Sequence, residues 1–229
     1  MKVGQDLFVL YFEPPPGLEA LIVDSRCPRT GPAVLLFADS IDIDLWAREP
    51  LEPQLALWTE VAIGYSCTVR GQPATAFHYP YLMLSSARSD QGMALADVEM
   101  TRFHPACPGY EGGAPGRRCS ATARTFGGVP IVDLEVTLER PGTQVPEGLL
   151  RWVNRICYRD VTSPGHPMDL GLWLVPALEP RLADVWSGTG TARFSAGMGW
   201  SGQVEGEAWT FGTVYSLGAG EALGVGETL

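Results

Sequence analysis

The chain has 229 residues, of which 45% are hydrophobic and 18% are charged, and its formal net charge is -10. This composition is typical of a globular domain with a sizeable core, and it argues against intrinsic disorder. The acidic balance disfavours nucleic acid and anionic membranes as partners, because both require a basic surface.

The N-terminal segment does not resemble a targeting sequence. MKVGQDLFVLYFEPPPG has an early aspartate and a proline-rich break after a short apolar run, whereas a secretory signal needs a longer apolar core and a cleavage site. No other apolar run approaches the roughly 20 residues of a membrane span. The five cysteines are widely spaced and odd in number, which favours free thiols in a reducing compartment. We therefore expect a cytoplasmic protein.

Along the chain, segments with alternating or β-branched and aromatic residues predict strands over 7–12, 33–38, 61–69, 132–139 and 209–217. PPGLEALIV at 15–23 predicts a short helix that begins at proline, and GMALADVEM at 92–100 is interpreted as a second one. The 27 glycines and 19 prolines punctuate the chain with turns. The pattern favours a curved sheet or barrel with a few helices, in a single domain over residues 1–229.

The stretch 104–118 is rich in proline and glycine, and we interpret it as a surface insertion between strands that should be mobile. His104, Cys107 and Cys119 are conceivable zinc ligands in and beside it. The paired C-x2-C spacing is absent and no fourth ligand stands out, so the sequence argues against a metal site at these residues.

Several local signatures, taken in order, resemble the acetoacetate decarboxylase-like superfamily. They are the early helix PPGLEALIVD, the strand WTEVAIGYSCTVRGQ, the strand YPYLMLSS, the late strand RLADVWSGTGTARFS and the closing EAWTFGTVYSLGAGEALG. The resemblance extends from about residue 7 to 224. It implies a mostly β (α+β) fold, namely an antiparallel, partly closed β-barrel with a few short helices.

The resemblance also implies a catalytic lysine that this chain lacks. Members of the superfamily form an imine between a lysine and a β-keto acid, and that lysine would fall at about Met100 and Thr101 in GMALADVEMTRF. Lys2 is the single lysine of the sequence, and it lies at the N-terminus. We therefore expect a pocket without Schiff-base chemistry and without a cofactor.

Glu60 is the candidate catalytic residue. It follows Trp58 in the WTE segment, and the resemblance places the corresponding carboxylate inside the barrel cavity. A desolvated carboxylate has a raised pKa and is suited to general acid or base catalysis. The alternative is an outward-facing strand glutamate, and the sequence leaves both open.

The remaining candidate residues would bind substrate. Trp58, Tyr79, Tyr81, Met83 and Met100 are expected to line or floor the same cavity, although aromatic residues and methionine at strand spacing are more often core residues. In RWVNRICYR at 151–159, Arg155 and Tyr158 belong to a group able to hold a carboxylate or an enolate, with a surface cluster as the alternative.

These observations lead to three hypotheses. The first is a cofactor-independent enzyme of bacterial secondary metabolism that cyclises, rearranges or eliminates from an apolar, carbonyl-bearing, polyketide-type intermediate. The second is a β-keto acid decarboxylase that works without an imine, and the third is a non-catalytic barrel that binds a small molecule. A homo-oligomer is compatible with all three.

Overall fold

The computed structural model describes residues 2–23, 25, 28–42, 56–68, 75–85, 94–95, 97–100, 112–142, 156–160, 170–174 and 181–216. The elements in these segments are β1 (Lys2–Phe12), α1 (Pro16–Ile22), β2 (Arg29–Asp42), β3 (Ala56–Thr68), β4 (Thr75–Leu84), β5 (Ala94–Leu95), β6 (Asp97–Met100), β7 (Arg118–Arg124), β8 (Pro130–Pro141), β9 (Ile156–Asp160), β10 (Leu170–Leu174), β11 (Arg181–Phe194), η1 (Ala196–Met198) and β12 (Gly202–Ser216).

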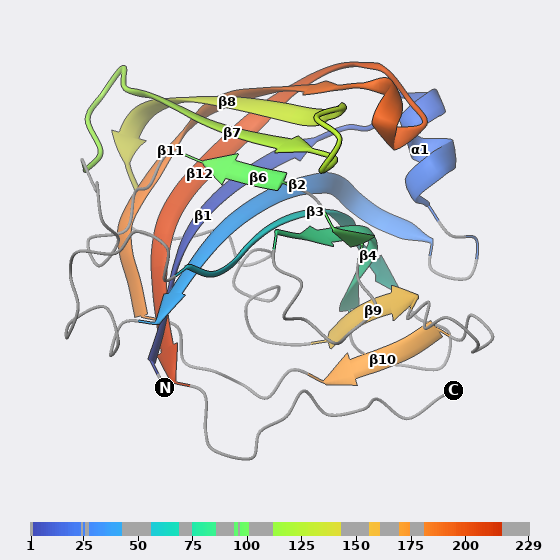
Figure 1. Ribbon diagram of the computed structural model, residues 1–229, viewed down its shortest axis with the longest axis horizontal. Coiled ribbons are helices and arrows are strands. Elements are labelled where there is room, and N and C mark those ends of the chain that lie inside the picture. Colours follow the sequence, from blue (N-terminus) through green and yellow to red (C-terminus); the bar gives the residue numbers. More distant parts are fainter. Residues whose placement is uncertain are drawn as a thin grey trace.

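The strands of these segments form one sheet in the order β10-β9-β4-β3-β2-β1-β12-β11-β8-β7-β6, with β5 added to β4 (Figure 1). Pairing is antiparallel, except that β4 pairs in parallel with β5 and β9. The predicted strands at 7–12, 33–38 and 132–139 lie within β1, β2 and β8, and those at 61–69 and 209–217 match β3 and β12 as far as residues 68 and 216.

The sheet curls, so that strands far apart in its order come together. Figure 1 shows β8, β7 and β6 arching over β1, β2 and β3. Where β6 meets β3, the Thr59 hydroxyl lies 3.1 Å from the Val98 carbonyl oxygen. The predicted fold class, a mostly antiparallel and partly closed barrel with few helices, is therefore confirmed.

The curl gives the central strands an inner face and an outer face, because successive side chains of a strand point to opposite sides. On the inner face, Phe8, Phe37 and Val61 lie next to one another and belong to a cluster with buried residues of α1, β7, β8 and β11. The outer face carries a second buried cluster, formed by Leu7, Val9, Val34, Leu36, Ala38, Ala62 and Phe211.

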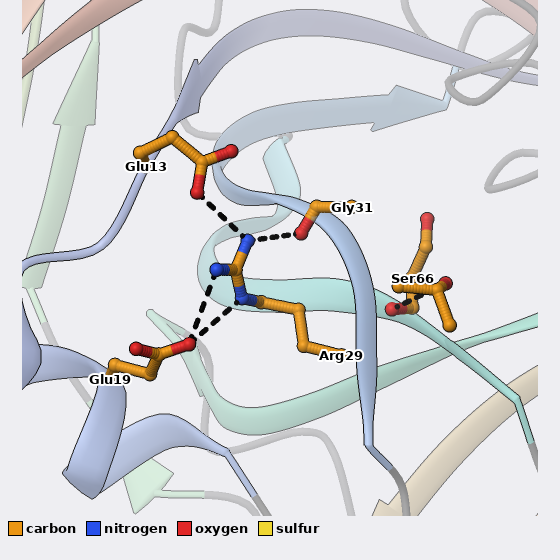
Figure 2. Close-up of polar contacts among 6 residues, drawn as sticks. Glu13, Glu19, Arg29, Gly31 and Ser66 are labelled. Carbon is orange, nitrogen blue, oxygen red and sulfur yellow. Dashed lines mark hydrogen bonds and ion pairs between the residues drawn. The ribbon is translucent and has the colours of Figure 1, made fainter.

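Helix α1 closes one end of the inner cluster. Its seven residues are too few for an independently stable helix, so its stability depends on packing of the buried Leu18 and Ile22. Figure 2 shows a second tie, in which the Arg29 guanidinium of β2 donates to Glu19 of α1 at 3.2 Å and to Glu13 at 3.1 Å. Arg29 also donates to the Gly31 carbonyl, which fixes its direction. The helix predicted at 15–23 is confirmed.

The second predicted helix, at 92–100, is wrong. Residues 94–95 form β5 and residues 97–100 form β6, which pairs with β7. In β6 the exposed Asp97 and Glu99 alternate with the buried Val98, as in a half-buried strand. A segment this short fits helical and strand periods equally well, and pairing with β7 decided between them.

The predicted mobile insertion at 104–118 is only partly described. Residues 104–111 lie outside the described residues, and residues 112–117 form an irregular turn before β7. Gly112 and Gly116 both have positive φ values, 68° and 79°, which glycine adopts without a steric penalty. The mobility of the insertion stays a prediction.

The outer face also buries polar atoms. The Tyr11 hydroxyl and the Trp209 indole nitrogen are buried and have no hydrogen-bond partner in the part of the chain that the structure describes. Burial raises the pKa of Tyr11, and the nearby negative charge of Glu207 raises it further. The phenol therefore remains protonated well beyond the ordinary range of tyrosine.

Gly206 tests how closely β12 must approach β1. A Cβ atom at this position would lie 1.7 Å from the Tyr11 carbonyl oxygen, so Gly206→Ala must displace backbone. We expect a loss of about 1–3 kcal/mol in the free energy of unfolding, measured by urea titration. Gly31→Ala is the control, since a Cβ there meets no atom within 4 Å. Equal stability of the two variants would contradict the packing described here.

Tyr11→Phe tests the buried phenol. Near neutral pH the variant should melt at the same or a higher temperature, because an unpartnered buried hydroxyl is removed. The folded-state pKa of Tyr11 lies above its unfolded value of roughly 10, so the wild type loses stability as the pH rises beyond about 10. Thermal melts across this range should show a smaller alkaline loss for Tyr11→Phe. Parallel losses would show that Tyr11 ionises as an exposed tyrosine does.

Candidate functional site

Polar side chains form one cross-strand row on the inner face, beside the apolar row that contains Phe8. Asp6 of β1 lies opposite Asp39 of β2, and Asp39 lies opposite Thr59 of β3. The two aspartates are 0% and 1% exposed. Aspartate is rarely buried so completely in proteins, which marks this row as the most unusual part of the described core.

Hydrogen bonds anchor the β3 end of the row. The Thr59 amide donates to the Ser85 hydroxyl at 2.9 Å, and the Ser85 amide donates back to the Thr59 carbonyl oxygen at 2.9 Å. The two hydroxyl oxygens are 2.5 Å apart. Because Thr59 also contacts the Val98 carbonyl, the row ends at β6. This strand lies in the segment where the family resemblance would place the missing lysine.

The register places the carboxyl groups of Asp6 and Asp39 on neighbouring strands of one face. Cβ atoms of opposite residues in antiparallel strands are roughly 4.5–5.5 Å apart. Two full negative charges about 5 Å apart repel each other by about 3 kcal/mol at an effective dielectric constant near 20. Both carboxylates take part in further polar or electrostatic interactions. Two carboxyl groups held at one site can serve as general acid and general base where their surroundings separate their pKa values.

The positions beside Asp6 on the inner face are two glycines and a buried hydroxyl. Gly212 lies opposite Asp6 on β12, and Gly4 precedes it on the same face of β1; neither carries a side chain. Thr210, diagonal to Asp6 on the inner face, is 0% exposed, and its hydroxyl has no hydrogen-bond partner among the described residues. A buried hydroxyl of this kind is suited to a water molecule or a ligand oxygen.

Glu60, the predicted catalytic residue, belongs to another row. It lies opposite Ala38, which lies opposite Leu7, and both are buried members of the outer cluster. Glu60 is half-buried, and its side chain takes part in a polar or electrostatic interaction. Tyr81, by contrast, lies opposite Ile63 and packs against the inner cluster. Glu60 and Tyr81 are thus on opposite faces of the sheet. The strand register therefore does not direct both residues toward one cavity, as the sequence suggested.

Tyr81 borders a pocket of about 10 Å³ between β3, β4, β8 and η1, lined by Val61, Ile63, Tyr81, Ile131, Val132 and Met198. This volume holds about one water molecule and is too small for an organic substrate. Met100 is half-buried and also packs against the inner cluster. In these positions Tyr81 and Met100 act as core residues, and a substrate contact for either one stays a prediction.

The other predicted binding residues are placed less completely. Trp58 lies opposite Ser40 in β3, Tyr79 and Met83 lie in β4, and Tyr158 lies in β9. Their side chains are not among those described, and Arg155 lies outside the described residues. Their roles remain predictions.

The conceivable zinc ligands are likewise divided. Cys119 is a buried cysteine in β7 that is not part of a disulfide, whereas His104 and Cys107 lie outside the described residues. Within the described segments, no three histidine, cysteine or acidic residues gather closely enough to hold a metal ion. Nor does any helix of these segments have the length and apolar character needed to cross a membrane.

The sequence matches no protein-family profile and no curated protein. Solved structures do share its fold. An acetoacetate decarboxylase-like enzyme from Sphingomonas wittichii has a TM-score of 0.64 at 18% identity, over 100% of this chain and 93% of the other. Acetoacetate decarboxylase from Legionella pneumophila has a TM-score of 0.64 at 13% identity, over 99% and 85%.

A third similar structure is the enduracididine biosynthesis enzyme MppR, complexed with the condensation product of pyruvate and imidazole 4-carboxaldehyde. Its TM-score is 0.61 at 21% identity, over 93% of this chain and 86% of the other. The chain therefore has the acetoacetate decarboxylase-like fold, as the sequence resemblance implied. Structures with this fold include both a decarboxylase and an enzyme of natural-product biosynthesis.

Thr59→Val tests the hydrogen bonds at the end of the polar row. The variant keeps the side-chain shape but removes the Thr59 hydroxyl. The buried Val98 carbonyl and the Ser85 hydroxyl then each lose a hydrogen bond. We expect a loss of about 1–2 kcal/mol in the free energy of unfolding. Thr122→Val, at a half-buried position of β7, serves as the control and should change stability little. An unchanged Thr59→Val would show that these bonds do not fix β6 to β3.

Proposed function

We propose that the chain is an enzyme of small-molecule biosynthesis that converts a carbonyl-bearing substrate by general acid–base catalysis without a Schiff base. The cross-strand pair Asp6–Asp39 is the observation that carries the proposal. Two buried carboxylates at one site supply a proton donor and a proton acceptor, which enolisation requires. The shared fold with a decarboxylase and a biosynthetic enzyme supports a reaction at a carbonyl group.

In the proposed reaction, the ionised carboxylate removes a proton from the carbon next to the carbonyl. The protonated carboxyl, or the Thr210 hydroxyl, donates a hydrogen bond to the carbonyl oxygen as negative charge develops there. The enol so formed then attacks a second carbonyl of the same molecule or expels a leaving group. Cyclisation, rearrangement and elimination all begin with this step, and none of them needs a cofactor.

The basic residues argue against an imine. The family position at Met100 carries no amine, and β6 ends there. Lys2 lies at the start of β1, four residues before Asp6, which corresponds to roughly 13 Å along an extended strand. Decarboxylation through a lysine imine is thus disfavoured, and Glu60 on the outer face remains the alternative acid–base residue.

The proposal is tested by hydrogen–deuterium exchange at the α-carbon of acetylacetone and methyl acetoacetate, followed by NMR in heavy water. The wild type should accelerate exchange, and Asp39→Asn and Asp6→Asn should each reduce the enzymatic rate about 10²- to 10⁴-fold while melting cooperatively. The Glu60→Gln variant distinguishes a catalytic site on the inner face of the sheet from one on the outer face. Loss of exchange in Glu60→Gln with full rates in both aspartate variants would move the chemistry to the outer face.

Reductive trapping is the companion experiment. Borohydride added with acetoacetate or pyruvate should leave the protein unlabelled, and mass spectrometry would detect an adduct. A stable adduct at Lys2 would overturn the proposed mechanism.

A further inference from the structure

Large apolar side chains are exposed at one end of the sheet. In the described segments they are Phe126 at 65%, Val129 at 51% and Leu21 at 41% exposure. Phe126 and Val129 lie in the turn between β7 and β8, and Leu21 lies in the last turn of α1. Figure 1 shows this turn and α1 at the same end of the molecule. Single exposed hydrophobic residues are common in proteins, whereas a group of them at one place marks an interaction site.

The short helix η1 joins these side chains into one surface. A Cβ atom added at Gly199 would lie 3.7 Å from the Leu21 side chain, and one at Gly197 would lie 2.9 Å from the Pro130 carbonyl oxygen. Because Pro130 directly follows Val129, η1 lies between α1 and the β7–β8 turn. We call the exposed residues of these three elements the end surface: Leu21, Phe126, Val129, Pro130, Ala196, Gly197 and Gly199.

The end surface is uncharged, although the protein as a whole is acidic. The segments TFGGVP at 125–130 and SAGMGWSG at 195–202 contain no charged residue, whereas the chain carries a net charge of -10. Two copies of such a chain repel each other at long range, so a neutral surface is the favourable place for them to meet. The small residues of η1 also let a second backbone approach closely.

The charges that border the end surface beside α1 are mainly negative. Glu13 and Glu19 both pair with the Arg29 guanidinium, at 3.1 and 3.2 Å. The two glutamate side chains are 74% and 42% exposed, whereas that of Arg29 is 19% exposed. Two carboxylates thus share one cation, and this group presents an excess of negative charge to solvent.

The charges beside the β7–β8 turn have the opposite balance. The Arg124 guanidinium at the end of β7 lies 3.4 Å from Asp133 of β8. Arg193 of β11 lies opposite Asp133 and donates to the uncharged Gln203 at 3.3 Å. In this group two cations accompany one carboxylate. A two-fold rotation that places the turn of one copy over α1 of a second copy brings unlike charges together twice, as an isologous interface requires.

We infer that the end surface is the contact between two copies of this chain, related by a two-fold axis. Phe126 is its anchor, because it is the most exposed of the apolar side chains and buried aromatic residues dominate binding energies. Three such side chains supply less than the roughly 800 Å² per partner of a standard interface, so the dimer dissociates on dilution. The inference does not depend on the proposed function, since neither Asp6 nor Asp39 takes part.

Sedimentation equilibrium over about a hundredfold range of protein concentration tests the inference. The wild type should approach twice the mass of one chain as its concentration rises. Phe126→Asp places a charge in the apolar contact and should raise the dissociation constant at least about tenfold. Phe126→Ser, which adds no charge, should weaken association by a smaller factor. Both variants should melt as the wild type does, because the side chain is exposed in the single chain.

Ala114→Asp is the matched control, because it adds the same charge at an exposed position in the turn before β7, at the other end of that strand. Its dissociation constant should equal that of the wild type. A wild type that stays monomeric, Phe126 variants that associate normally, or an equal loss in Ala114→Asp would each overturn the inference.

A charge exchange tests the two-fold arrangement. Arg124→Glu should weaken association, and Glu13→Arg in the same chain should restore part of it, because the two groups face each other across the contact. A double variant that associates no better than Arg124→Glu would refute this arrangement. These experiments measure mass and not catalysis, so their failure would leave the proposed function untouched.

Discussion

The antiparallel pairing of β1 with β2 is the constraint on which the rest of the structure depends. It places Asp6 opposite Asp39 and, one row along the same face, Phe8 opposite Phe37. A slip of one residue would turn the polar row and the apolar core to the other face together, because the side-chain period of a strand is two. The positions of the core and of the candidate site are therefore one property of the register.

Burial of the aspartate pair opposes folding, and the fold compensates for it. The apolar row beside it is fully buried and continues through β3, and α1 is fixed over the end of the core by Leu18, Ile22 and the Arg29 contacts. A design for stability alone would place apolar residues at 6 and 39. A local feature that costs stability within an otherwise consistent core is commonly a functional one.

The shared fold and the missing lysine together suggest how chemistry can change on a constant scaffold. The fold is shared with the three solved structures at sequence identities of only 13–21%. In the segment that includes β6, the sequence resemblance would place the amine of the family at Met100 or Thr101. The carboxylate pair lies in the row that ends beside this strand. Acid–base catalysis in place of imine formation would then need new side chains but no new backbone.

The sequence by itself determined the first helix and the strands within β1, β2, β3, β8 and β12, because alternation over 132–139 and the proline start of PPGLEALIV are local signals. It also determined that no lysine lies near Met100. It could not determine β6, since four residues fit either period until β7 supplied a pairing partner. Nor could it find the Asp6–Asp39 pair, whose members are 33 positions apart and become neighbours only through the β1–β2 register. The same cause separated Glu60 from Tyr81: their distance in sequence is fixed, but the face that each occupies depends on cross-strand pairing and burial, which only the tertiary structure decides.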